Sequence, residues 1–213
     1  MTNETMTVHE ALCELKTIGK RIDKAISQGV FVRTKRHSDA MIDGKSVDDF
    51  KNQIKASYQK VTDLIRRREA IKKAVTQSNA TTIVTIGNLE MSVAEAIEYK
   101  NSGVDYKTKL LENMSRSYEV ARRAINQNNG DALQSAADSY IAALFGSKES
   151  IADVSIIENA KNAYIENNSL DLVDPISIVR EIERISEEID NFTTKVDSAL
   201  SISNAITTIT FSY

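Results

Sequence analysis

The sequence predicts a mainly α protein: a bundle of long antiparallel helices packed like a coiled coil, with a small β-hairpin and a C-terminal strand at one end. Two observations predict it. The 213 residues include only seven Gly and one Pro, against roughly 12% for these two types in an average protein. Apolar residues also recur every seven positions, which is typical of long helices that interlock side by side. We expect a flexible segment at 1–6 and one helical domain at 7–213.

The helices are placed by their apolar rows and their capping signals. Thr7, Ser46, Ser92 and Asp131 each stand three residues before an acidic or amide side chain, the spacing of an N-terminal capping box. Asp174-Pro175 predicts another start, with proline at the first helical position. The predicted helices cover 8–26, 47–75, 93–125, 131–146, 149–167 and 178–199.

Two segments change from the helical period to alternation. Residues 81–91 are β-branched around Gly87-Asn88 and predict a hairpin. Residues 206–213 alternate as well, and the chain carries no charge from Ser198 to its end. Because a lone hairpin is marginal in water, we expect this tail to add a third strand, in its own chain or in a neighbour's. The residues expected to form this assembly strand are Ile206, Ile209, Phe211 and Tyr213.

Residues 27–45 have no helical period, and we expect a long basic loop there. The first 79 residues carry a net charge of +6 and the remainder −9, so the two parts would attract each other within a chain or between subunits. Clustered cations in the loop and on the second helix could bind an anion or a partner. These candidates are Arg33, Lys35, Arg36, Arg66, Arg67 and Arg68.

Arg68, Lys100 and Lys107 interrupt the apolar rows of their helices. A polar residue in such a row fixes the register of packing when it pairs with an opposite charge. We therefore expect each of them to pair with a carboxylate of the acidic part of the chain.

The sequence offers little for catalysis. His9 and Cys13 have the spacing of two zinc ligands on one helix turn, but a closed zinc site needs two further ligands. There is no Gly-x-Ser-x-Gly element and no Gly-rich phosphate loop, which are the usual settings of an activated serine and of a bound nucleotide. We therefore expect no enzyme activity, no catalytic or metal-binding residue and no cofactor.

Part of the chain resembles the septicolysin-like family. The similar segments are Glu10–Leu12, Asp63–Ile71, Ser78–Thr81, the Gly87 turn, Met91–Ile97, Val196–Leu200 and Ile206–Thr208. Ile206 departs from the family's pattern, which has Trp at this place. The resemblance implies a fold of long helices with a small sheet, in which 130–173 is a helical insertion. The family's name suggests a cytolysin, but the resemblance supplies no site residues.

These observations favour a structural or interaction subunit that forms a homo-oligomer, for example a phage tail or virion component. One alternative is an oligomeric regulatory or counter-defence protein that binds a charged small molecule or nucleic acid. Another is a membrane-active, cytolysin-like protein. Other subunits of a larger particle are possible partners, and we expect neither nucleic acid nor a membrane to be the main one. We expect the protein in the cytoplasm or in an assembled particle.

Overall fold

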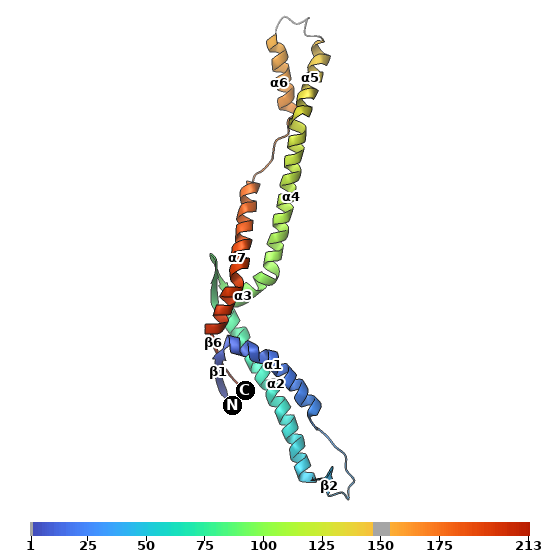
Figure 1. Ribbon diagram of the computed structural model, residues 1–213, viewed down its shortest axis with the longest axis vertical. Coiled ribbons are helices and arrows are strands. Elements are labelled where there is room, and N and C mark those ends of the chain that lie inside the picture. The colour runs from blue at the N-terminus through green and yellow to red at the C-terminus, as the bar shows by residue number, and fades with distance from the viewer. Residues whose placement is uncertain (1, 147–153) are drawn as a thin grey trace. The chain divides into compact units, whose positions relative to one another are not determined.

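The computed structural model describes residues 2–146 and 154–213 and is mainly helical (Figure 1). The chain forms two compact units instead of the single predicted domain. Unit 1 consists of Met1–Ser102 and Asn191–Tyr213, and unit 2 of Gly103–Asp190. A seven-residue period shows that a helix packs against something, but not which helices share a core.

Unit 1 is built on two long helices, α1 (Val8–Gln28) and α2 (Val47–Thr81). They enclose an apolar core with the C-terminal strand β6 (Thr208–Ser212). Because the tail contributes to this core, the two ends of the chain complete one structure. The buried core residues are Val8, Ala11, Ile71, Val75, Ile209 and Phe211.

Capping interactions start the helices of unit 1 as predicted. In α1, the Thr7 hydroxyl accepts a hydrogen bond from the Glu10 amide at 3.2 Å, and the Thr7 amide donates to the Glu10 carboxylate at 2.8 Å. Ser92 and Glu95 form the same reciprocal pair at the start of α3 (Val93–Glu98). Ser46 caps α2 by accepting from the amide of Asp49. These bonds satisfy amide groups that the first helical turn leaves unpaired.

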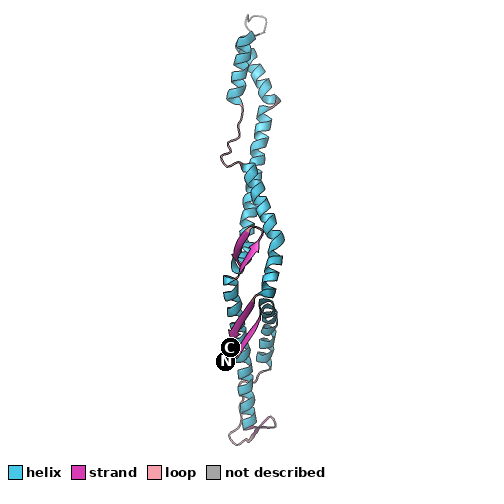
Figure 2. Cartoon of the chain, turned by 90° about the vertical axis from the view of Figure 1, so that its left-hand side faces the viewer, coloured by secondary structure: helices cyan, strands magenta, loops and turns pink. Residues whose placement is uncertain are grey.

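Three separate antiparallel pairs of strands occur in unit 1 (Figure 2). The predicted hairpin is confirmed as β4 (Ile83–Ile86) and β5 (Leu89–Ser92). The tail does not join the hairpin of its own chain: β6 pairs with β1 (Asn3–Thr7). Residues 3–7 thus form a strand where a flexible 1–6 segment was expected. The predicted 27–45 loop contains a short strand, β2 (Met41–Ile42), which pairs with β3 (Lys45–Ser46).

The predicted 93–125 helix is interrupted. α3 is followed by a π-helical stretch, Tyr99–Gly103, and only then by α4 (Val104–Asn129). The extra residue per turn of a π-helix shifts the phase of the side chains that follow. The aromatic ring of Tyr99 meets that of Phe192 edge-on, with centroids 4.6 Å apart. The interruption falls where the chain passes from unit 1 into unit 2.

Unit 2 contains α4, α5 (Asp131–Phe145), α6 (Val154–Asn168) and the first part of α7 (Ile178–Ile206). Residues 149–153 of a predicted helix lie outside the described residues. Two start signals were wrong. Gly130, not Asp131, occupies the cap position of α5. Pro175 lies in the turn before α7, where the Asp174 carboxylate accepts from the amide of Ile178 at 2.9 Å.

Candidate interaction surfaces

The most elaborate polar cluster of unit 1 surrounds Arg67, whose side chain is 18% exposed. Its guanidinium donates to both carboxylate oxygens of Glu4, at 2.6 and 2.7 Å, and to both of Glu14, at 2.5 and 3.0 Å. It also donates to the hydroxyl of Tyr213, which in turn donates to Glu4 at 2.8 Å. A planar guanidinium suits such two-pronged contacts. Arg67 therefore links β1, α1, α2 and the C-terminal residue.

Charge and hydrogen bonding reinforce one another in this Arg67 cluster. The hydrogen bonds from Arg67 and Tyr213 lower the pKa of Glu4, because they stabilise its ionised form. The bonds to Glu14 and Glu4 raise the pKa of Arg67 in the same way. The Arg67 guanidinium also lies over the Tyr213 ring, 4.9 Å from its centre, which adds a cation–π contact. The side chains of Glu4, Glu14, Arg67 and Tyr213 thus bond to one another, and the role of the cluster is structural.

The sequence predicted that Arg68 fixes the register of α2, but in the structure Arg67 has this role. Arg68 is exposed, because the inward face of α2 passes from Leu64 to Arg67 and then to Ile71. The two carboxylate partners of Arg67, Glu4 and Glu14, also come from the basic part of the chain and not from the acidic part. The other two predictions are confirmed. Lys100 pairs with Asp197 at 2.5 Å, and Lys107 pairs with Glu188.

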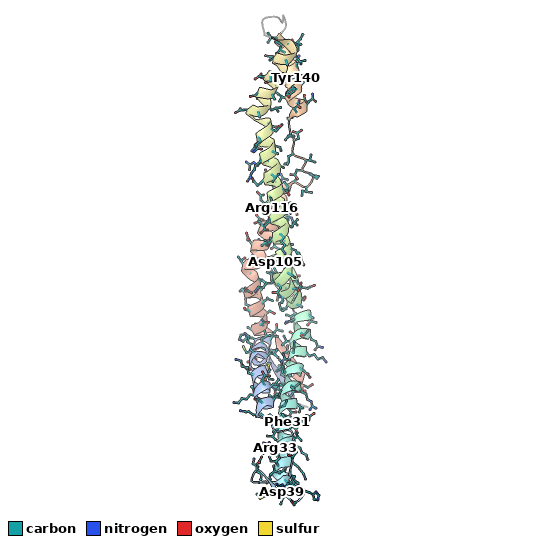
Figure 3. All side chains as sticks on the ribbon, turned by 90° about the vertical axis from the view of Figure 1, so that its right-hand side faces the viewer. Phe31, Arg33, Asp39, Asp105, Arg116 and Tyr140 are labelled. Carbon is teal, nitrogen blue, oxygen red and sulfur yellow. The ribbon has the colours of Figure 1, made fainter. Side chains whose placement is uncertain are left out.

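The predicted anion-binding cations do not converge. In the loop, Arg33 faces Asp43 at 3.9 Å, while the Lys35 ammonium donates to three loop carbonyls at 3.0–3.1 Å. Figure 3 shows Arg33 in this loop. The loop ends at the start of α2, and a helical rise of 1.5 Å per residue places Arg67 roughly 30 Å along that helix. Arg36 belongs to the same loop, and Arg66 is exposed beside Asp63.

A basic groove of about 780 Å³ lies between α1 and α2, and the predicted candidate Arg67 belongs to its lining. Three further cations line it, Arg21, Lys24 and Lys60, and none of them forms an ion pair within the described part of the chain. The lining also holds two carboxylates, Glu14 and Asp63, which pair with Arg67 and Arg66. Arg21, Lys24 and Lys60 were not among the predicted candidates, because these three cations are scattered along two helices. A search for cations that two neighbouring helices bring together, instead of a run of cations along one helix, could have identified the groove.

The predicted assembly strand is mostly used inside its own chain. Ile209 and Phe211 are only 5% and 6% exposed, and Tyr213 belongs to the Arg67 cluster. Ile206 is the exception, with 73% exposure. The apolar face of the tail is therefore covered within the fold of unit 1, and Ile206 at the end of α7 is left exposed.

One edge of the hairpin is open. The amide of Val93 donates to the carbonyl of Thr82 at 2.9 Å, so Thr82 and alternate residues after it bond to β5. The backbone groups of Ile83 and Thr85 point the other way. That edge borders a groove of about 600 Å³ lined by β4 and by the C-terminal part of α7, including Ala199, Ile202 and Ile206.

A second unpartnered surface runs along α4 in unit 2. The residues of this surface are spaced alternately four and three positions apart, which is the pattern of a coiled-coil seam. All of them are exposed. Tyr106, Leu110 and Val120 are 71%, 50% and 62% exposed. This outer seam of α4 consists of Tyr106, Leu110, Asn113, Ser117, Val120 and Ala124. The sequence analysis identified only the other, half-covered row of this helix.

Two charged rows run beside the outer seam. The acidic row is Asp105, Glu112 and Glu119, and each of these precedes by four residues a member of the basic row, Lys109, Arg116 and Arg123. Acid four positions before base is the favourable order on a helix. Asp105 and Arg116 mark these rows along α4 in Figure 3. The rows keep the exposed helix polar on one side of its apolar seam.

The two zinc-spaced residues, His9 and Cys13, lie on the exposed side of α1, with 3.8 Å between the ring nitrogen Nε2 and Sγ. Over residues 2–146 and 154–213, no group of three or more His, Cys, Asp or Glu side chains could hold a metal ion. Over the same ranges, no helix is both long and apolar enough to cross a membrane.

Comparisons of the chain with protein-family models, with curated proteins and with solved structures found no match.

Proposed function

We propose that this protein is a non-enzymatic structural or interaction subunit that assembles with copies of itself, as a component of a phage tail or virion would. The observation that carries the proposal is the large solvent-accessible surface area of the chain. The chain exposes 14,930 Å², whereas a compact monomer of 23.6 kDa exposes about 9,800 Å². Two separate compact bodies with the sizes of the two units would still expose only about 11,800 Å². The excess is area that association with other subunits would cover.

Unit 2 contributes much of this area. In its described residues only four side chains are buried: Leu133, Ala137, Ile141 and Ile185. The whole of α4 has no buried residue, although its outer seam is partly apolar. Exposed apolar surface of this extent is typical of protein–protein contacts. A stable assembly would supply the core that unit 2 has only in part.

Paired charges between helices support an architectural role as well. Lys100 meets Asp197 within unit 1, and Lys107 meets Glu188 within unit 2. Both pairs join residues far apart in sequence: Lys100 of the π-helical stretch and Lys107 of α4 each meet α7 and favour one register between these segments. Such fixed registers suit a subunit that presents extended helical faces to its neighbours.

Sedimentation velocity across a range of concentrations tests the proposal. We expect a defined oligomer that Leu110→Glu or Val120→Glu weakens, because either change places a charge in the outer seam. Asn126→Glu is the matched control, since Asn126 is exposed on the same helix outside the seam. A monomer at every concentration would contradict the proposed function.

The basic groove favours a second candidate function, the binding of a charged small molecule. Arg21, Lys24 and Lys60 line one cavity and have no carboxylate partner in the described residues. Titration calorimetry with ATP at low and high salt tests it. Binding should weaken with salt and be lost in Lys24→Ala/Lys60→Ala but not in Arg66→Ala/Arg68→Ala, whose sites lie outside the groove lining. Equal heats for both double variants would contradict a site in this groove.

A further inference from the structure

We infer that β4 is a contact between two copies of this chain, in which the two β4 edges pair antiparallel about a two-fold axis at Val84. The inference rests on the proposed self-assembly and names its interface. It joins two hairpins into one four-stranded sheet. Two-fold contacts that use the same surface on both subunits are the commonest way in which identical chains associate.

Backbone geometry provides the hydrogen-bonding groups for this contact. Within the hairpin, Thr82 and Val84 direct their backbone groups to β5, so Ile83 and Thr85 direct theirs to the open edge. With Val84 on the axis, Ile83 of one copy lies opposite Thr85 of the other. Each such pair exchanges two N–H···O bonds, and the axis generates the pair twice. The edge is therefore self-complementary at this register, with four new bonds.

Apolar side chains surround the edge and would be covered by the second copy. Ile83 is 62% exposed, and Ile202 and Ile206 on α7 are 59% and 73% exposed. All three line the groove of about 600 Å³ beside β4. Hydrogen bonds alone add little net free energy, because water bonds to the free groups as well. Burial of these isoleucines supplies the main driving force for pairing.

The strand β4 itself lacks the protection that exposed strands usually carry, and the charged residue that lines the groove beside it is Lys195 of α7. Proteins keep free edges from pairing with charged residues, proline or bulges, and Ile83–Ile86 contains neither charge nor proline. The opposite edge of the hairpin differs: it carries Glu90, and the amide of Ser92 is already bonded to the Glu95 carboxylate. Pairing is thus directed to β4 and away from β5.

The open edge of β6 is a weaker candidate. The bonds between Val8 and Thr207 and between Thr2 and Tyr213 leave alternate residues of β6 facing outward. The outward residues are Thr208, Thr210 and Ser212. Their side chains are small and polar, and the apolar residues of this strand, Ile209 and Phe211, are buried in unit 1. A second copy would gain little apolar burial there.

Amide hydrogen exchange at high and low protein concentration tests the interface residue by residue. We expect the amides of Ile83 and Thr85 to exchange about tenfold or more slowly when the protein is associated than when it is dilute. The amide of Glu90, on the opposite edge, should exchange at the same rate in both. Protection of Ile83 and Thr85 that does not depend on concentration would mean that the edge is covered within one chain, and would overturn the inference.

A matched pair of proline variants tests the same contact by sedimentation. Thr85 and Glu90 are directly opposite in the hairpin, and each amide points away from the other strand. Thr85→Pro removes a donor from the proposed interface, and Glu90→Pro removes one from the outer edge of β5. We expect the two-fold species to be lost in Thr85→Pro and kept in Glu90→Pro.

Charged variants cover the case in which proline prevents folding. Ile83→Lys and Thr85→Lys keep the amides but bring like charges together across the axis, and we expect the same loss of the two-fold species. An assembly that persists in these variants, with Ile83 and Thr85 unprotected, would overturn the interface while leaving the proposed function intact. A protein that never associates would overturn both.

Discussion

The guanidinium of Arg67 lies 4.9 Å from the centre of the Tyr213 ring, and both side chains bond to the carboxylate of Glu4. This relationship connects the middle of α2 to residues near both ends of the chain. Glu14 completes the cluster from α1. The carboxylates of Glu4 and Glu14 share the single guanidinium of Arg67 in a largely covered position. The cluster therefore depends on Arg67.

Removing Arg67 should therefore destabilise unit 1 strongly. Arg67→Ala leaves Glu4 and Glu14 close together without a counter-charge, and we expect a loss of about 2–4 kcal/mol in the free energy of unfolding. Arg68→Ala is the matched control, because Arg68 is exposed and should change stability by less than about 0.5 kcal/mol. Urea unfolding followed by circular dichroism measures both. Similar midpoints for the two variants would contradict the structural role of the cluster.

The Glu4 carboxylate should make stability depend on pH in the acid range. Its pKa in the folded protein is lowered from the usual 4.5 by the hydrogen bonds from Arg67 and Tyr213. A lowered folded pKa contributes stability above the unfolded pKa, and that contribution disappears as the pH falls through the folded value. We expect Glu4→Gln to cost stability at pH 7 and progressively less below pH 4.5. A stability difference that stays constant from pH 7 to pH 2.5 would contradict this assignment.

The cap of α3 should contribute about 1 kcal/mol. The hydroxyl of Ser92 accepts from the amide of Glu95 at 3.2 Å, and the Ser92 side chain is largely buried. Ser92→Ala leaves that amide unpaired, so thermal unfolding should occur at a lower temperature. Ser201→Ala is the control, since Ser201 is exposed within α7 and alanine favours a helix. A melting temperature unchanged by Ser92→Ala would mean that water replaces the cap.

The segment between α6 and α7 should be released by one substitution. The side-chain amide of Asn129 donates to the carbonyl of Leu170 at 2.8 Å and accepts from its amide at 2.8 Å. Asn129→Ala removes both bonds, and amide exchange of 170–176 should become faster. Asn126→Ala, at an exposed position on the same helix, should leave it unchanged. If both variants exchange alike, other contacts hold this segment.

Local signals in the sequence predicted local structure well. Thr7, Ser46 and Ser92 cap their helices because a capping box needs only residues three positions apart. The hairpin at Gly87 was equally accessible, since glycine there has a φ of +62°, which suits a two-residue turn. These elements depend on neighbours in the chain, so a single sequence contains the information.

Longer-range features escaped prediction for physical reasons. Asn3–Thr7 has little apolar alternation, and it forms a strand only because the tail lies beside it. Arg67 was missed because a strict seven-residue count from Val61 points to Arg68, whereas the inward face of a straight helix drifts from that count. The α4 outer seam needed coordinates too, because only burial distinguishes a covered row from an exposed one. In each case tertiary context decided between local alternatives.

Unit 2 lies between the two segments that make up unit 1 in the order of the chain. During synthesis on the ribosome, α4, α5 and α6 therefore emerge before β6 exists. The Val8 and Ala11 side chains of α1 cannot complete their core until Ile209 and Phe211 have been made as well. Structures closed by such distant segments form slowly and late. While α4, α5 and α6 are being made, the apolar face that α1 and α2 present to β6 would therefore stay uncovered by that strand.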